Sequence, residues 1–244
     1  MSVRLTTATA ARVLRQLRHD RRTLAMLLVV PCVLIGLLAW VFDGTPVFDR
    51  IGAPLLGVFP FVVMFLVTSV TTLRERRSGT LERLLAMPLG KLDLIGGYAL
   101  AFGALAVVQA VVATAFAIWV CGLDVAGSVW LLLLVAVADA VLGCTTGLLL
   151  SAFATTEFQA VQFMPAVVLP QFLLCGLLMP RAQLNSLLHG LSDVLPLSYA
   201  VDAMTKVTSQ PEVSAGLLGD LLVVVLFAAF TVALGAATLR RRTA

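Results

Sequence analysis

Residues 128–152 read SVWLLLLVAVADAVLGCTTGLLLSA, and this stretch decides the class of fold because it holds a single charged residue, Asp139. A helix needs about 20 consecutive apolar residues to cross the hydrocarbon core of a bilayer, so the stretch predicts a transmembrane helix. The whole chain of 244 residues has the same character, since 60% of its residues are hydrophobic and 12% are charged. A soluble domain carries roughly 25% charged residues. The sequence therefore indicates a membrane protein.

Six apolar segments of this kind follow one another along the chain. They lie near 24–42, 54–73, 94–121, 128–152, 161–180 and 217–239. Each is long enough to cross a bilayer as a helix. The segment 161–180 contains Pro165, Pro170, Gly176 and Pro180, which favours a bent or partly re-entrant segment buried against protein. We expect an all-α polytopic membrane protein whose 244 residues (1–244) form one transmembrane domain.

The positive charges predict the orientation of the bundle. Fourteen of the 17 Lys and Arg lie in the N-terminal segment, in the connector 74–93 and in the C-terminal tail. Connectors rich in Lys and Arg stay in the cytoplasm, so both termini are predicted to be cytoplasmic, in a bacterium at the inner membrane. The other three, Arg50, Arg181 and Lys206, fall on the opposite side. The net charge of +4 thus follows topology and does not indicate nucleic-acid binding.

Few residues of the chain are suited to catalysis or to metal binding. There are two His and four Cys, and no two Cys have C-x-x-C spacing. His19 and His189 lie outside the predicted spans, on opposite predicted sides of the membrane. An intramembrane enzyme needs clustered polar groups at membrane depth. We therefore predict no catalytic residue, no metal ligand and no enzymatic activity.

Residues 3–22 predict an amphipathic helix on the cytoplasmic membrane surface. The apolar residues recur at helical spacing and are Ala10, Val13, Leu14 and Leu17. The basic residues take another face and are Arg12, Arg15, Arg18 and Arg22. Such a face suits anionic lipid headgroups or an acidic partner. A topology signal without a partner is the alternative.

The connector 74–93 is long for a simple turn, which needs about five residues. Gly79 and Thr80 suit a helix start, and Glu82 lies where the helix dipole favours an acid. An apolar face and a stop are supplied by Leu81, Leu84, Leu85 and Pro88. The pattern predicts a short helix over 79–87 that docks in a groove of another protein. A positively charged inner loop is the alternative.

The predicted fourth span contains a charged residue, Asp139, and a glycine pattern, and both bear on how the span packs. A charge at the membrane centre costs about 2.5–3.5 kcal/mol, so Asp139 is expected to face a cavity, to be paired or to stay protonated. A role in a substrate path or proton site and a neutral structural role both remain open. Gly143 and Gly147 form a G-x-x-x-G pattern that favours close helix packing.

Beyond the fifth span, leucines at helical spacing predict a short amphipathic helix at the outer interface. They are Leu184, Leu187, Leu188 and Leu191. The sequence Leu195-Pro196-Leu197-Ser198-Tyr199 then returns the chain toward the last span.

Two stretches resemble the membrane subunit of ABC type-2 exporters, a family that includes drug-resistance and polysaccharide or lipid-export permeases. Glu75-Arg76-Arg77-Ser78-Gly79-Thr80-Leu81-Glu82-Arg83-Leu84-Leu85 with Pro88 is similar to the coupling segment of that family. Cys175-Gly176-Leu177-Leu178-Met179-Pro180 and Leu195 to Asp202 look like its segment between the fifth and sixth spans. Tyr98 stands where the family often has Lys, and Cys175 where Ser is common.

The resemblance implies a half-transporter in which two six-span permeases, identical or sister chains, enclose one pathway. Separate cytoplasmic ABC ATPase subunits would bind ATP and Mg, and no cofactor is expected on this chain. The sequence has no G-x-x-x-x-G-K-[ST] run for ATP phosphates. Residues 1–23 would form a connecting helix, and 181–197 would cap the pathway outside. The implied ATPase-coupling residues are Glu75, Arg76, Gly79, Thr80, Leu81, Glu82 and Leu85, with a second contact at Thr156 and Glu157.

The expected function is export of a hydrophobic or amphipathic small molecule, of the drug or antibiotic type, from the cytoplasm or inner leaflet. Export of a lipid or glycan is the alternative within the family. Ion-coupled secondary transport through Asp139 is the alternative from a different class, but it calls for several intramembrane ionisable groups.

Overall fold

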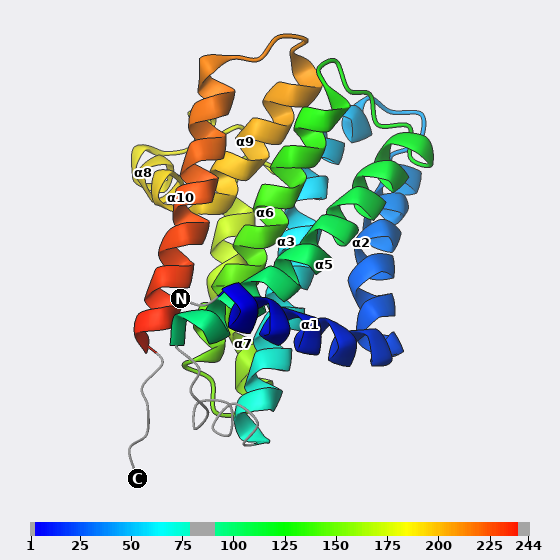
Figure 1. Cartoon of the computed structure of the whole chain (residues 1–244). Helices are drawn as coiled ribbons and strands as arrows, with labels where there is room; N and C mark the ends of the chain where they lie inside the picture. Colours follow the sequence, from blue (N-terminus) through cyan, green and yellow to red (C-terminus); the bar gives the residue numbers. More distant parts are fainter. Residues whose placement is uncertain (1–2, 79–90, 239–244) are drawn as a thin grey trace.

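The computed structural model describes residues 3–78 and 91–238, and their regular structure is entirely helical (Figure 1). The elements are α1 (Val3–His19), α2 (Arg21–Val41), α3 (Val47–Arg77), α5 (Lys91–Trp119), α6 (Val129–Ser151), α7 (Glu157–Leu174), the 3-10 turn η1 (Arg181–Gln183), α8 (Ser186–Val194), α9 (Pro196–Ser209) and α10 (Ala215–Thr238). The predicted all-α class is confirmed. Helices suit this composition because a backbone in lipid must pair its own N–H and C=O groups.

Five of these helices are long and apolar enough to cross a membrane. They are α2, α3, α5 from Gly96 onward, α6 and α10. They correspond to five of the six predicted spans, so the chain is a multi-pass membrane protein. The second span is longer than the predicted 54–73, because α3 starts at Val47 and continues through Arg77.

The predicted single span over 161–180 needs correction. Helix α7 starts at Glu157 and ends at Leu174, and it is not among the helices apolar enough to cross by themselves. Its 18 residues rise about 27 Å, less than the roughly 30 Å of a hydrocarbon core. Figure 1 shows α7 leaving the same end of the bundle as α1, while α9 reaches the opposite end beside α10. The height of the bundle is therefore covered by two helices with α8 between them.

The break after α7 has a local cause. Gly176 has φ +98°, a left-handed conformation that glycine adopts without steric cost. Pro180 then precedes the turn η1. The predicted outer helix is present as α8, where Leu187 and Leu191 are exposed. The helix α9 that follows was not predicted as a separate element, because its start, Leu195-Pro196, was interpreted as a returning connector.

Helix α3 forms the centre of the bundle and packs against α2, α5, α6, α7 and α9. Of its most apolar stretch, 72% is buried, against 22% for α2 and for α10. Helices α2 and α10 therefore present most of their surface outward, to lipid or to a partner. Helix α3, by contrast, is surrounded by other helices of the chain.

The G-x-x-x-G pattern packs α6 against the backbone of α3, as predicted. A Cβ atom placed on Gly143 would lie 2.5 Å from the carbonyl oxygen of Phe61, and one on Gly147 would clash with the carbonyl oxygen of Phe65. Real Cβ contacts are not that short. The absence of side chains at these two positions is therefore what allows α6 and α3 to approach so closely.

Helix α1 confirms the predicted apolar stripe, since Ala10, Val13 and Leu17 are buried. The stripe faces protein rather than lipid, because α1 packs on α5. A Cβ on Gly97 of α5 would lie 2.5 Å from the Cβ of Thr9. The predicted helix 3–22 is too long, because α1 ends at His19 and α2 begins at Arg21.

Replacement of Gly147 by Ala should destabilise the bundle by about 1–3 kcal/mol, the usual cost of overpacking a close contact. Gly103→Ala in α5 is the matched control, because a Cβ there meets nothing within 4 Å. The free energy of unfolding is measured in mixed micelles titrated with dodecyl sulfate. Equal effects of the two substitutions would contradict the assigned contact.

Candidate functional site

Three consecutive side chains at the end of α3 bind three different helices. We call this end of the bundle, where α1, the end of α6 and the start of α7 also lie, the base (Figure 1). Neighbouring residues on a helix point about 100° apart, so Arg74, Glu75 and Arg76 project in different directions. Their partners are on α7, α1 and α6 respectively.

Glu75 links α3 to α1. Its carboxylate is 3% exposed and accepts two hydrogen bonds from Arg12, at 3.1 Å to Nη2 and 3.5 Å to Nη1. The Nη2 atom of Arg12 also donates to the hydroxyl of Tyr98 on α5, at 3.0 Å. The guanidinium lies 5.9 Å from the Tyr98 ring centroid, within cation–π range. A single arginine thus joins α1, α3 and α5.

Arg76 links α3 to the end of α6. Its Nη1 atom donates to the backbone carbonyl of Ser151 at 2.6 Å. Ser151 is the last residue of α6, where carbonyls have no helical partner and the helix dipole is negative. The arginine therefore satisfies an orphan carbonyl and is favoured by the dipole.

Arg74 links α3 to the first turn of α7. Its Nε and Nη2 atoms donate to the two carboxylate oxygens of Glu157, each at 3.0 Å. The hydrogen bond from Arg74 holds the pKa of Glu157 below its ordinary value. A lowered folded-state pKa means that the pair stabilises the fold above the ordinary glutamate pKa and is lost as pH falls through the lowered value. The preceding Thr156 caps α7 by accepting from the backbone N–H of Gln159 at 3.1 Å.

Asp139 is fully buried in the middle of α6. Among the described residues, neither of its carboxylate oxygens has a hydrogen-bond partner. Its spacing from Gly143 and Gly147 places it on the face of α6 that packs on α3. Pro60 in α3 has no backbone N–H, so the carbonyl of Leu56, four residues earlier on α3, lacks its usual helical donor. The predicted role of Asp139 in a substrate path stays a prediction.

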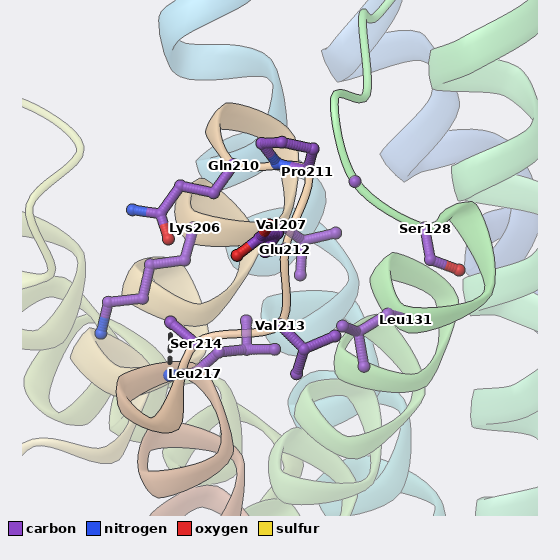
Figure 2. A pocket seen from close by; sticks show the side chains of 11 residues that line it. Ser128, Leu131, Lys206, Val207, Gln210, Pro211, Glu212, Val213, Ser214 and Leu217 are labelled. Atoms are coloured by element: carbon purple, nitrogen blue, oxygen red, sulfur yellow. Dashed lines mark hydrogen bonds between the residues drawn. The ribbon is translucent and has the colours of Figure 1, made fainter.

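A small cavity lies at the end of the bundle opposite the base (Figure 2). Its volume is about 30 Å³, and its lining comes from the end of α9, the start of α10, their connector and the start of α6. Lys206 lines it and forms an ion pair with Asp220. The space suits one or two waters, whereas small-molecule sites occupy about 300–1,000 Å³.

Arg181 organises the segment between α7 and α9. It donates to the hydroxyl of Ser192 at 2.7 Å and pairs with Asp193 and Asp202. Its guanidinium lies 5.2 Å from the ring centroid of Tyr199. The guanidinium thereby fixes η1, α8 and α9 against one another.

Residues 4–208 match the family model described as ABC-2 type transporter. The match covers most of the chain. The chain belongs to the ABC-2 type transporter family. It is a membrane permease of that family, since the matched region is the membrane domain and not the ATPase.

Curated relatives share parts of the permease. ABC transporter G family member 20 of Dictyostelium discoideum is 28% identical over 156 residues, which are 64% of this chain and 21% of the relative. The probable multidrug ABC transporter permease YbhR of Escherichia coli strain K12 is 29% identical over 148 residues, which are 61% of this chain and 40% of the relative. The aligned region thus spans about a fifth to two fifths of these relatives.

The base of the permease brings together residues that the sequence assigned to two separate contacts. Glu75 and Arg76 were expected in the coupling segment, and Thr156 and Glu157 in a second contact. Arg74 joins the two groups through Glu157. The other predicted coupling residues, Gly79, Thr80, Leu81, Glu82 and Leu85, lie outside the described residues, so the helix over 79–87 stays a prediction.

Sequence reasoning missed the partners of Glu75. Arg12 was placed on the basic face of the first helix, which was expected to bind lipid headgroups or an acidic partner, and Tyr98 was noted only as a departure from the family. Arg12 is half-buried, whereas Arg15 and Arg18 of α1 are exposed. The apolar stripe does not reveal this difference, because Arg12 points about 100° away from Val13 on the helix.

Glu75→Gln should destabilise the permease by about 1–3 kcal/mol, because the guanidinium of Arg12 loses a charged partner in a half-buried position. Glu157→Gln removes the same charge from an exposed pair and should cost less than about 1 kcal/mol. Unfolding free energies in mixed micelles test both. In a double-mutant cycle with Arg12→Gln, additive effects would contradict direct pairing with Glu75.

Proposed function

We propose that this permease is the membrane half of an ATP-driven exporter, powered by separate cytoplasmic ABC ATPase subunits. Membership of the ABC-2 type transporter family supports the partnership. The observation that carries the proposal is the cluster at the base. Arg74, Glu75 and Arg76 lie in the last turn of α3, which ends at Arg77. The chain then enters the predicted coupling segment and returns in α5.

In this mechanism, ATP binding moves the coupling segment and with it the end of α3. The three side chains then transfer the displacement to α7, α1 and α6, to which they are bound at the base. Packed helices move as rigid bodies between discrete arrangements. The central, mostly buried α3 would therefore shift the walls of the pathway together. ATP and Mg would be bound by the partner subunits alone.

The proposed cargo is a hydrophobic or amphipathic small molecule of the drug type. One relative is named a probable multidrug permease. The outward faces of α2 and α10 are apolar and suit contact with lipid or with a second permease, whether an identical copy or a sister chain. Export of a lipid or glycan is the runner-up, since the same apolar spans would accept an acyl chain.

The proposed location is a bacterial inner membrane with both termini in the cytoplasm. The arginine-rich α1, the end of α3 and the end of α10 all lie at the base (Figure 1). Positive charge gathered at one end of a bundle favours the cytoplasmic side. The base would then face the ATPase subunits.

Glu82→Arg should prevent the ATPase subunit from co-purifying with the permease, or should uncouple ATP hydrolysis from transport, because it reverses a charge in the predicted docking helix. Asp49→Arg is the matched control. Asp49 is exposed in the first turn of α3, at the end of the bundle opposite the base. The measurement is stoichiometric co-purification in mild detergent together with vanadate-sensitive ATP hydrolysis.

Transport by Glu82→Arg at the wild-type rate, with the ATPase bound, would refute the assignment of residues 79–87. A permease that purifies alone and shows no associated hydrolysis in mild detergent would refute the ATP-driven mechanism itself. The first result is obtained with the Glu82→Arg variant and the second with the wild-type permease, so the two can be told apart.

Asp139→Asn tests the ion-coupled alternative. Asparagine keeps the size of the side chain but cannot release a proton. In an ATP-driven exporter, ATP hydrolysis without cargo should stay within about twofold of wild type, and wild-type transport should continue when ionophores dissipate the proton and sodium gradients. Transport is measured in vesicles with ATP inside or outside. If wild-type transport stops when the gradients are dissipated, whatever the ATP supply, and Asp139→Asn does not transport, ion coupling through Asp139 would be favoured.

A further inference from the structure

The junction of α1 and α2 is a well-defined corner. α1 ends at His19 and α2 begins at Arg21, so Asp20 alone separates the helices. The Asp20 carboxylate accepts from the backbone N–H of Thr23 at 3.1 Å and from its hydroxyl at 2.6 Å. These hydrogen bonds hold the pKa of Asp20 below its ordinary value. The acid is thus occupied in capping α2.

Four arginines surround this corner, and all are exposed. They are Arg15, Arg18, Arg21 and Arg22. Among the described residues, none of the four forms an ion pair. The side chain of Arg15 donates to the backbone carbonyl of Ala11, at 3.2 Å. The corner therefore carries concentrated positive charge that the described part of the chain does not neutralise.

An exposed apolar stripe continues from the corner along α2. Arg22 shares one helix face with Met26, Val29, Val33 and Leu37, which follow at i+4, i+7, i+11 and i+15. Met26 is 63% exposed and Val33 is 56% exposed. From Arg22 to Leu37 this face is about 22 Å long, at 1.5 Å per residue. Positive charge at the membrane interface is thus joined to an apolar track that enters the membrane.

We propose that this corner binds an anionic phospholipid, with its phosphate among the arginines and an acyl chain along the stripe on α2. Arg21 is the first residue of a helix that can span the membrane, so the arginines lie at headgroup level. An acidic protein would match the charge but would leave the apolar stripe without a partner. A phospholipid matches both.

Lipid binding at the corner does not depend on the ATP-driven mechanism. Both proposals involve α1, which carries the arginines of the corner and also Arg12 of the base. The lipid would hold the end of α1 against α2. The same helix carries Arg12, which binds Glu75 at the base. An occupied corner would therefore stabilise the arrangement of α1 on α3 and α5.

The test is a titration of the full-length permease in detergent, followed by native mass spectrometry. The probes are dioleoyl phosphatidylglycerol and dioleoyl phosphatidylcholine. The first phosphatidylglycerol should bind at least about fivefold more tightly than the first phosphatidylcholine, since one arginine near an anionic surface contributes about fivefold. Arg18→Gln with Arg22→Gln should remove most of that preference.

The matched control is Arg4→Gln with Arg50→Gln, which removes the same charge from two other exposed arginines. Arg4 lies about 21 Å along α1 from Arg18, and Arg50 lies at the opposite end of the bundle. The control should keep the preference. Both arginines of the test pair are exposed, so the melting temperature without added lipid should stay unchanged, whereas phosphatidylglycerol should raise it only in the wild type and the control.

Three results would overturn the proposal. The first is an equal preference for phosphatidylglycerol in the test pair and in the wild type. The second is displacement of the lipid by an equal concentration of glycerol 3-phosphate, which would mean a free phosphate site in which the apolar stripe has no part. The third is loss of ATPase binding in the test pair with its lipid preference intact, which would make the corner a protein-docking surface.

Discussion

The backbone contact between α6 and α3 is the constraint on which the rest of the bundle depends. Gly143 and Gly147 remove the side chains that would separate these helices, so α6 lies directly on the carbonyls of α3. α3 then occupies the centre, with its polar end emerging at the base. At the base, Arg76 of α3 donates to the last carbonyl of α6, so a second contact holds the same two helices together.

Charged side chains at the base have hydrogen-bond partners, because they lie where an apolar bundle meets water. A helix with Arg74, Glu75 and Arg76 in its last turn must place three polar groups where a packed bundle meets water. Burial of Glu75 is tolerated because Arg12 supplies two hydrogen bonds and the opposite charge. The exposed Arg74–Glu157 pair contributes less stability but fixes the start of α7. One strong and one weak link thus join the end of α3 to helices that the proposed mechanism moves.

The segment between α7 and α9 interrupts the helical path of one membrane crossing. Near Gly176 the chain breaks within the bundle, and the freed polar groups are bound internally. Ser192 donates to the carbonyl of Leu174, the last residue of α7, at 3.0 Å, and Arg181 in turn donates to Ser192. Non-helical backbone close to a membrane requires such internal partners. Arg181, counted in the sequence only as a charge for topology, is thus a structural centre of this region.

The sequence by itself determined the helical class, the five long apolar spans, the apolar stripe of α1 and the close packing at Gly143 and Gly147. Each depends on local composition or on periodicity along one helix, and lipid leaves an apolar chain few other folds. Only the tertiary structure decided that Glu75 binds Arg12, 63 residues away, and that Arg74 binds Glu157, 83 residues away. It also decided that α7 and α9 divide one crossing. Such pairings depend on which helix faces meet, and the periodicity of a single helix does not specify its neighbour.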